Sequence, residues 1–439
     1  MLKLTFKQTD KELLVRAAAT VLFSALARSG AKLVRVADLT ERPQYGFTAS
    51  AVSEPVGPKF VRITDLKDGQ IDWASVPFCE CPKPEAYLLN QNDLLFARTG
   101  ATTGKTHLVR GFEHAVFASY LIRVRPKPGV FAGYLHAFFQ SDNYWLQISE
   151  EKEGSAQPNV NGEKLATIQI PVVDLKVQHS IAEFIDCVRR RQDGQNVELP
   201  ELPPSLSKQR RVVMRIEEVA EQIREIRTLR RGAIEEAESL LRSILTHDQM
   251  AKPTPMRELV RMRTPDVLVR PGENYQFAGV YCFGRGVFRA TAKSGMDFAY
   301  LRLSRLRTGD FVYPKLMAWE GAFGIVPPEC NGCVVSTEFP VFEVNEERIL
   351  PAVLDTYFRM PSVWPEIAGK STGTNVRRRR LNPQDFLNYK MPLPSREAQM
   401  TLRDVKSKTD ELQHLQDATV ADLDALLPAI FDQAFRGDL

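Results

Sequence analysis

Two long segments of the chain repeat their apolar residues with the period of a coiled coil. In Leu206 to Leu245, apolar residues recur every seven positions, with partners four positions later: Val212, Val219, Ile226, Ala233 and Leu240, with Ile216, Ile223, Ala237 and Ile244. In Ala398 to Phe435, the pattern returns at Val405, Leu412 and Leu426, beside Leu402, Leu423 and Ile430. These are a and d positions of a heptad, so the pattern predicts two long amphipathic helices.

A helix of about 40 residues cannot bury an apolar stripe by itself. Because the two predicted helices have similar lengths, we expect them to pair antiparallel with each other. Two alternatives stay open: each helix packs on the domain that precedes it, or it dimerises with a second chain.

The sequence outside these helices contains an internal repeat. Three strings recur in the same order: NQNDLLFARTG (90–100) as RLRTGDFVYPKL (305–316), FASYLIRVRP (117–126) as VSTEFPVFEV (335–344), and GSAQPNVNGEKLATIQIPV (154–172) as GKSTGTNVRRRRLNPQDFLNYKMPL (369–393). Asp93 matches Asp310 at an offset of 217, and Asn159 aligns with Asn375 at an offset of 216. Matches in one order and at nearly one offset indicate a duplication.

Each copy of the repeat mixes strand and helix patterns. β-branched and aromatic runs bounded by Gly, Pro and Asp predict strands at 58–71, 93–98, 120–126 and 279–288, whereas 130–148 and 349–364 have helical spacing. We therefore predict an α+β protein: two similar α/β domains separated by a pair of long antiparallel coiled-coil helices, with a pseudo-two-fold internal repeat. The expected segments are an N-terminal helical segment 1–30, a first domain 31–176, a connector with the first long helix 177–250, a second domain 251–395, and the second long helix 396–439.

Composition narrows the class of protein. The 439 residues are 44% apolar and 26% charged, as in a soluble globular protein of two to four domains, and no apolar run is long enough to span a membrane. The apolar stretch Leu13 to Leu26 contains Arg16, which favours a helix starting after Asp10 over a signal peptide. Six cysteines without zinc-site spacing indicate incidental thiols in the reducing cytoplasm. A net charge of +4 does not by itself indicate nucleic-acid binding.

The stretch RTGATTGKT, Arg98 to Thr106, resembles a phosphate-binding loop but departs from it at one essential position. That loop has four residues between its glycines. Only three separate Gly100 from Gly104, and Thr99 occupies the place of the missing glycine. We expect a glycine-rich turn between two strands. A methyltransferase Asn/Asp-Pro-Pro-aromatic motif, a nuclease carboxylate pair and a catalytic triad are also missing from the sequence, so we predict no active site and no cofactor or metal.

The repeated loops carry side chains suited to DNA. Asn and Gln can pair bidentately with adenine and Arg with guanine, whereas a run of arginines more often faces phosphates. The candidate DNA-binding residues of the first copy are Arg98, Thr99, Thr102, Lys105, Gln157, Asn159, Asn161 and Lys164. Those of the second copy are Lys315, Trp319, Thr374, Asn375, Arg377, Arg378 and Arg379. A plain solvated hairpin is the alternative for the loop around Thr102.

These strings resemble the specificity subunits of type I restriction-modification systems. The resemblance rests on FVRITDL, NDLLFARTG, FASYLIRVR and GSAQPNVN in the first copy, and on YQFAGVYCFGRGVF, STEFPVFEV and LPSREAQ in the second. It implies a non-catalytic DNA-recognition subunit, in which each target-recognition domain binds one half of a split site and the helices set the distance between the halves. The N-terminal 30 residues and the stretch 177–204 depart from the simple pattern.

The implied partners are double-stranded DNA, two modification methyltransferase subunits and restriction motor-nuclease subunits, with no membrane. Those subunits would supply S-adenosylmethionine binding, adenine methylation, ATP use and cleavage. The alternatives are a stand-alone DNA-binding adaptor of the same fold and an unrecognised DNA-modifying enzyme.

Overall fold

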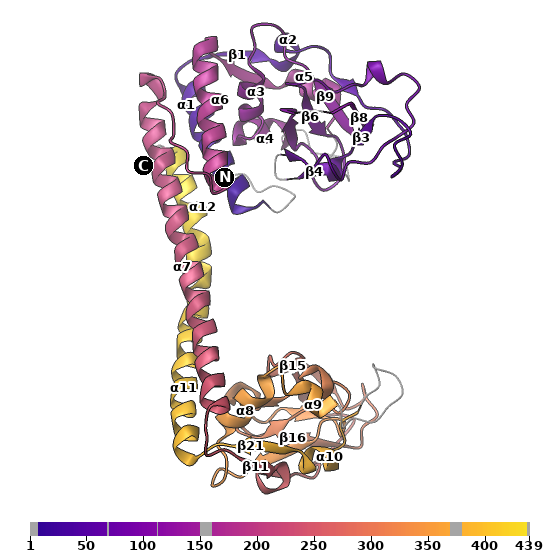
Figure 1. Cartoon of the computed structure of the whole chain (residues 1–439), viewed down its shortest axis with the longest axis vertical. Helices are drawn as coiled ribbons and strands as arrows, with labels where there is room; N and C mark the ends of the chain where they lie inside the picture. Colours follow the sequence, from indigo (N-terminus) through magenta and orange to yellow (C-terminus); the bar gives the residue numbers. More distant parts are fainter. Residues whose placement is uncertain (1–7, 68–69, 112, 150–159, 369–379, 437–439) are drawn as a thin grey trace. The chain divides into compact units, whose positions relative to one another are not determined.

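The computed structural model describes residues 8–67, 70–111, 113–149, 160–368 and 380–436 (Figure 1). Its contacts divide the chain into two compact units. Unit 1 contains Met1–Glu225 and Ala421–Leu439, and unit 2 contains Ile226–Val420. In the part of the chain that the structure describes, none of the helices has the length and apolar character needed to cross a membrane.

Unit 1 begins with a helix that is buried around most of its circumference. Helix α1 (Asp10–Arg28) starts with a capping box, in which Thr9 and Glu12 satisfy each other's backbone N–H groups. Every residue from Leu14 to Phe23 is buried, so α1 is a core helix, and the helix predicted to start after Asp10 is confirmed. Arg16 is 2% exposed within this helix and forms an ion pair with Asp142.

The sheets of unit 1 hold the central core. A four-stranded antiparallel sheet has the order β2-β9-β6-β7, formed by Gln44–Tyr45, Leu121–Val124, Leu94–Ala97 and Thr106–Leu108. Smaller pairs are β1 (Lys32–Arg35) with β10 (Gln169–Val172), β3 (Lys59–Val61) with β8 (Ala115–Phe117), and β4 (Leu66–Lys67) with β5 (Gln70–Ile71). All four residues of β6 are buried, as expected for a run of apolar residues in a central strand.

Five further helices of unit 1 pack on this core. They are α2 (Val36–Leu39), α3 (Ala132–Phe138), α4 (Asp142–Ser149), α5 (Gly162–Thr167) and α6 (Leu175–Gln192). Residues of α1, α3, α4 and α6 meet in one large apolar cluster with the strands. The cluster includes Leu22, Phe138 and Phe184, each fully buried.

Unit 2 contains a five-stranded sheet, a four-stranded sheet and a further pair of strands. Its five-stranded sheet is β13-β16-β19-β14-β15, made of Val267–Leu268, Arg302–Arg305, Val334–Val335, Asn274–Val280 and Val287–Ser294. Its four-stranded sheet is β12-β20-β17-β18, made of Val260–Met262, Val341–Val344, Phe311–Val312 and Gly324–Ile325. Strand β11 (Lys252–Pro255) pairs with β21 (Lys390–Leu393). The helices are α8 (Pro351–Arg359), α9 (Trp364–Ala368), α10 (Pro383–Asn388) and α11 (Arg396–Ala418).

Equivalent hydrogen bonds occur in the two units. The N–H of Val36 donates to the carbonyl of Ile168 at 2.8 Å, next to the β1–β10 pair, and the N–H of Met256 donates to Tyr389 at 2.9 Å, next to β11–β21. The buried side chains of Gln178 on α6 and Gln399 on α11 each accept from the backbone N–H at the residue before α3 or α8. Helix α11 is thus the counterpart of α6.

The first predicted long helix is confirmed as α7 (Ser207–Thr246), but its buried seam differs from the heptad pattern. Val212, Ile216 and Ile223 are buried as expected, whereas Ile226 and Leu240 are 39% and 51% exposed. Within unit 2 the buried position is Leu241, one residue beyond the expected one. A straight helix has 3.6 residues per turn, so a strict seven-residue repeat drifts off the buried face.

The second predicted long helix is two helices. Helix α11 ends at Ala418, and α12 (Val420–Arg436) follows Thr419, whose φ of −107° and ψ of 3° are not helical. The adjacent β-branched residues Thr419 and Val420 have low helix propensity. Leu412 and Leu426, expected in the seam, are 38% and 46% exposed, whereas Leu402 and Leu423 are buried.

The long helices run antiparallel inside unit 2 (Figure 1). The side chain of Arg230 on α7 donates to Thr419 Oγ1 at 2.9 Å, and Leu241, further along α7, shares a core cluster with Leu402, which lies earlier in the sequence. Within unit 1, Val212, Val213 and Ile216 of α7 share a cluster with Phe431 and Ala434 of α12.

Candidate nucleic-acid interface

The glycine-rich stretch after β6 is a hairpin turn, as predicted. Strand β6 pairs antiparallel with β7, and the turn closes through Gly104 N–H donating to the Ala97 carbonyl at 2.8 Å and Ala97 N–H donating to Lys105 at 2.9 Å. Gly100 and Gly104 have φ values of 86° and 91°, which only glycine adopts without strain. A strand follows the turn where a phosphate-binding loop needs a helix.

Arg98 lies where the hairpin meets a second candidate loop. Its guanidinium carbon lies 5.0 Å from the centre of the Tyr45 ring, and its buried Nε has no hydrogen-bond partner among the described residues. The Arg98 carbonyl accepts from the N–H of Val160 at 3.0 Å, and Tyr45 Oη accepts from the N–H of Gly162 at 3.0 Å. The structure therefore joins the hairpin to the start of α5.

The other described candidates of unit 1 make contacts within the protein. Lys105 Nζ donates to Glu12 Oε1 on α1 at 2.7 Å, and both side chains are about one-third exposed or less. Thr102 accepts from Lys105 N–H through its carbonyl at 2.9 Å, and the Thr99 side chain is half-buried. Lys105 therefore has a carboxylate partner within the protein.

Asn161 and Lys164 support helix α5. The Asn161 side chain caps α5 by accepting from the N–H of Lys164 at 2.8 Å, and Lys164 Nζ donates to the carbonyl of Ile148 on α4 at 2.9 Å. Gln157 and Asn159 lie outside the described residues. The described part of this candidate loop therefore links α4, α5 and the hairpin.

Unit 2 has the same junction with different side chains. Lys315 lies in the loop that follows β17. Its carbonyl accepts from the N–H of Leu381 at 2.9 Å, as the Arg98 carbonyl does from Val160. Lys315 Nζ donates to the Thr337 carbonyl at 2.8 Å. Trp319 is half-buried, and its indole Nε1 has no partner in the described residues. The remaining candidates lie outside the described residues: Thr374, Asn375, Arg377, Arg378 and Arg379.

The two units match from Asn382 onward at a different offset from the one that the sequence suggests. Asn161 and Asn382 precede α5 and α10, and β10 and β21 follow these helices, which gives an offset of 221 instead of 216. Asn159 and Asn375 lie outside the described residues, so their equivalence stays a prediction.

Buried aspartates anchor the strand before each loop. Asp93 accepts from the N–H of Asn90 at 2.9 Å and pairs with Arg125 at 2.7 Å. Asp310 accepts from the N–H of Arg307 at 2.9 Å and pairs with Arg263. Burial raises the pKa of Asp310, and the Arg307 N–H and Arg263 oppose that effect. The match between Asp93 and Asp310 in the sequence is thus a match of structural roles.

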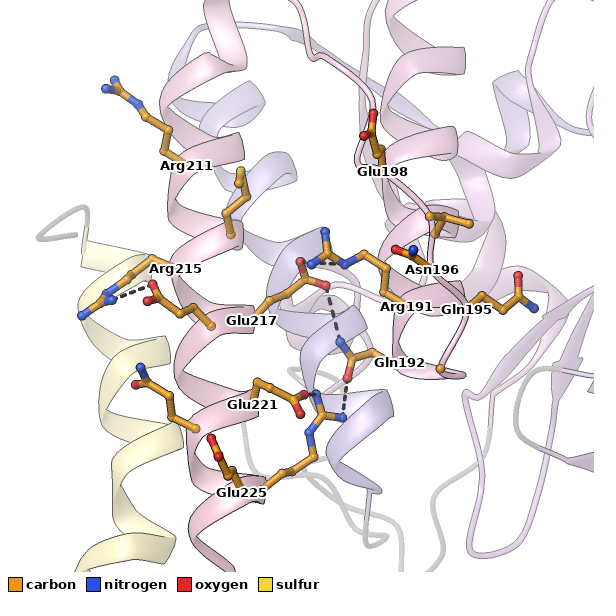
Figure 2. Close-up of a pocket in the computed structure, with 16 residues that line it drawn as sticks. Arg191, Gln192, Gln195, Asn196, Glu198, Arg211, Arg215, Glu217, Glu221 and Glu225 are labelled. Atoms are coloured by element: carbon orange, nitrogen blue, oxygen red, sulfur yellow. Dashed lines mark hydrogen bonds and ion pairs between the residues drawn. The ribbon is translucent and has the colours of Figure 1, made fainter. Parts of the chain in front are cut away.

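A large groove in unit 1 lies between α7 and the segment that ends α6 (Figure 2). Its volume is about 1000 Å³. Glu217 on α7 is 7% exposed, and burial raises its pKa against the opposing charge of Arg191. Gln192 accepts from Arg224 at 3.0 Å and donates to Glu217 at 3.4 Å, so polar contacts hold α6 to α7 along the groove.

The groove does not have the composition of a metal centre or a triad. In residues 8–67, 70–111, 113–149, 160–368 and 380–436, no three His, Cys, Asp or Glu side chains are grouped to hold a metal ion. The six cysteines are free thiols, as expected, and burial raises the pKa of Cys79 and of Cys330 to about 11, which keeps both protonated.

Part of the chain matches a known protein family. Residues 58–201 match the model of the type I restriction modification DNA specificity domain. The chain is similar to the type I restriction enzyme EcoKI specificity subunit of Escherichia coli (strain K12), 25% identical over 161 residues, and to the StySPI specificity subunit of Salmonella potsdam, 24% identical over 160 residues. Each match covers 35% of this chain and 34% of the relative, so it spans about a third of their length.

Solved structures of specificity proteins extend the similarity in fold. A chain from a structure of the type I R-M system, concerned with its complex assembly and conformational transition, has a TM-score of 0.55 and 19% identity, with 93% of this chain and 98% of that chain covered. The HsdS subunit of Thermoanaerobacter tengcongensis has a TM-score of 0.49 and 19% identity, with 93% and 97% covered. The first of these supports the α+β fold with long helices.

Two residues at the candidate loops were not among the residues predicted from the sequence. Tyr45, 40% exposed, contacts both Arg98 and Gly162, and the carbonyl of Tyr120, 63% exposed, accepts from the Arg98 N–H at 2.9 Å. Tyr45 lies outside the repeated strings and Tyr120 lies within FASYLIRVRP (117–126), and the pairing of β2, β9 and β6 brings both to the loop. The exposure of both side chains beside the glycine-rich turn is visible in the structure and not in the sequence.

Proposed function

We propose that this chain is the sequence-specific DNA-recognition subunit of a type I restriction-modification complex. Each unit would bind one half of a bipartite site in double-stranded DNA through the loop after β6 or β17 and the segment that precedes α5 or α10. The supporting observation is the repeated junction: Arg98 and Lys315 occupy equivalent positions and accept equivalent backbone hydrogen bonds from Val160 and Leu381. We keep residues 31–176 and 251–395 as the two target-recognition domains.

The chemistry of the two junctions suits different bases. The Arg98 guanidinium stacks on Tyr45, and a guanidinium carries a fork of donors suited to guanine or phosphate. Lys315 donates to a backbone carbonyl and lies 3.9 Å from a carboxylate oxygen of Glu338, which makes it a weaker candidate for base contact than Trp319. The two halves of the site would therefore differ in sequence.

The partners follow from the non-catalytic nature of the specificity family. Two modification methyltransferase subunits would supply S-adenosylmethionine binding and adenine methylation, and restriction motor-nuclease subunits would supply ATP use and cleavage, all in the cytoplasm. Exposed apolar side chains on α7 support docking of the methyltransferases on the long helices, since Leu229 and Leu240 are 64% and 51% exposed. The helices would also set the spacing of the half-sites.

Selection from a duplex DNA library of random sequence tests the proposed function. The full chain, alone and with its methyltransferase partner, should enrich a bipartite motif. Arg98→Ala should lose preference in one half of the motif by roughly tenfold or more at the contacted base, because a good bidentate contact contributes about 1–3 kcal/mol of discrimination. Changes at Lys315 or Trp319 should act only on the other half.

Arg35→Ala is the matched control. Arg35 is an exposed arginine on β1 that pairs only with Asp38 three positions later, so its loss should leave both half-motifs unchanged. Enrichment of a single undivided motif, or an equal loss in both halves with Arg98→Ala, would refute recognition by two separate units. A chain that binds DNA but does not associate with a methyltransferase would favour the adaptor alternative.

A further inference from the structure

Each unit packs a glycine of its candidate recognition loop against a tryptophan. A Cβ atom added to Gly104 would lie 2.7 Å from Cζ3 and 3.0 Å from Cη2 of Trp145. A Cβ added to Gly321 would lie 2.6 Å from Cζ2 of Trp364. Both glycines have positive φ, 91° and 74°, so a side chain is excluded by backbone strain and by the indole ring together.

These two contacts occupy equivalent places in the units. Gly321 follows Gly104 by 217 positions, the same offset that relates Asp310 to Asp93. Gly104 ends the turn after β6, and Gly321 ends the loop after β17. Trp145 lies on α4 and Trp364 on α9, the second helix after the sheet in each unit. Sequence analysis noted neither pair.

In unit 1 the contact closes a ring of three segments. The hairpin is joined to the start of α5 by Val160 N–H donating to Arg98, and α5 is joined to α4 by Lys164 donating to Ile148. Trp145 of α4 then returns to the hairpin at Gly104. Tyr144 Oη reinforces this side by donating to the Gly104 carbonyl at 2.8 Å.

Unit 2 closes the same ring with other side chains. Leu381 N–H donates to Lys315, which joins the loop to the start of α10. Tyr389, at the end of α10, donates to Glu366 of α9 at 2.9 Å, and Trp364 of α9 packs on Gly321. A hydrogen bond also fixes the indole, because Trp364 Nε1 donates to the Phe358 carbonyl at 2.9 Å.

We infer that Gly104–Trp145 and Gly321–Trp364 are positioning pairs that fix each recognition loop relative to α5 or α10, so that each pair determines specificity in its own half-site. Base readout requires that donors be held to within a fraction of an ångström. The lack of a side chain on the glycine lets the loop approach the indole this closely, and a Cβ there must move either the loop or the helix. This inference rests on the proposed function.

The test compares two alanine variants with two matched controls. Gly104→Ala and Gly321→Ala add strain and a clash with tryptophan. Gly129→Ala and Gly309→Ala add the same kind of strain, at φ values of 85° and 88°, but they lie outside the recognition loops and a Cβ there meets no atom within 4 Å. Library selection with the full chain should show a loss of roughly tenfold or more in one half-motif for Gly104→Ala, the same loss in the other half for Gly321→Ala, and an intact motif for both controls.

Rescue separates positioning from simple destabilisation. Trp145→Phe removes the ring atoms that a Cβ on Gly104 would meet, so the double variant should regain part of the lost preference, although each change alone weakens packing. A structural defect without positioning would instead make the double variant worse than either single one. Additive loss of preference in both half-motifs would overturn the inference.

Fluorine NMR of the 5-fluorotryptophan-labelled chain distinguishes failure of the pairs from failure of the proposed function. The chain has four tryptophans, so each resonance can be assigned by a Trp→Phe variant. Gly104→Ala should move the Trp145 resonance and Gly321→Ala the Trp364 resonance. If these shift while both half-motifs of the variants stay intact, the positioning role is overturned and DNA recognition stands. If the wild-type chain enriches no motif, DNA recognition and the role of the pairs in it are overturned together.

Discussion

Replacing Gln399 by leucine tests whether the two units are built on the same buried hydrogen bonds. Gln399 is 2% exposed on α11, and its Oε1 accepts from the N–H of Leu350 at 3.0 Å. Its Nε2 donates to the carbonyls of Pro394 and Arg348 at 3.0 and 3.2 Å. Leucine has a similar volume but can make none of these bonds.

The cost follows from the groups left behind. A buried donor without a partner costs about 1–3 kcal/mol, and Leu350 N–H is such a donor at the start of α8. The two carbonyls lose one acceptor interaction each, which adds less because a carbonyl has a second lone pair. We therefore expect Gln399→Leu to lower the free energy of unfolding of unit 2 by about 2–4 kcal/mol.

The same substitution can be made in unit 1 at Gln178, whose side chain makes one hydrogen bond fewer than that of Gln399. It is 4% exposed, accepts from Phe131 N–H at 3.1 Å and donates to the Val173 carbonyl at 2.9 Å, so Gln178→Leu should cost about 1–3 kcal/mol. Urea unfolding followed by hydrogen exchange and mass spectrometry reports each unit separately. Gln413→Leu, at an exposed position of α11, is the control and should change stability by less than about 0.5 kcal/mol. If Gln413→Leu costs as much as Gln399→Leu, or if Gln178→Leu weakens unit 2, the reasoning is wrong.

Three further outcomes are expected. Burial, and next the charges of neighbouring arginines, lower the pKa of His107 to about 4. Protonation of His107 therefore favours the unfolded state. The free energy of unfolding of unit 1 should fall by up to about 3 kcal/mol as the pH falls from about 6.5 to about 4. His107→Phe should reduce this loss when unfolding is followed as a function of acid pH. Arg16→Met should cost about 3–5 kcal/mol in urea unfolding because it removes one partner of the buried ion pair with Asp142, and Arg16→Lys should cost less. Inserting four residues near Ile223 and near Leu412 should lengthen each helix by about 6 Å. Methylation mapping should then show a half-site spacing longer by one to two base pairs. An unchanged spacing would exclude the helices as the spacer.

The fold was predictable where a residue's role is local or repeated. The hairpin after β6 followed from its glycines, and the duplication was visible because Asp93 and Asp310 each anchor a strand by bonding to the backbone three residues earlier. The long helix α7 followed from apolar periodicity. The break at Thr419 did not, because a heptad pattern continues across one non-helical residue without a change in composition.

The candidate site was less predictable because its contacts join distant parts of the chain. The ion pair between Lys105 and Glu12 spans 93 positions, and no local pattern shows that this lysine is already paired. Tyr45 reaches the loop only through the register of β2 on β9. Residue type therefore indicated candidate loops, whereas the partners of each side chain required the structure.

The repeated contacts explain how one scaffold can hold two different loops. The constant residues act on the backbone or by close packing: the aspartates accept from N–H groups, the glutamines bond to N–H and carbonyl groups, and the glycines admit an indole. None of these interactions depends on the side chains inside the loop. Unit 1 can therefore carry Arg98 where unit 2 carries Lys315 without a change in the surrounding frame.

The spacing of these constant residues locates the tolerated insertions. Asp310 and Gly321 lie 217 positions after Asp93 and Gly104, Trp364 lies 219 after Trp145, and Gln399 lies 221 after Gln178. Unit 2 thus has two residues more than unit 1 between the glycine and the tryptophan, and two more between the tryptophan and the glutamine. Length differences in connections cost little when both ends stay fixed, because the entropy of closing a loop grows slowly with its length. Under the proposed function, selection for a new DNA target would act on the loop residues, while the aspartate, the glycine–tryptophan pair and the glutamine would keep each loop in place.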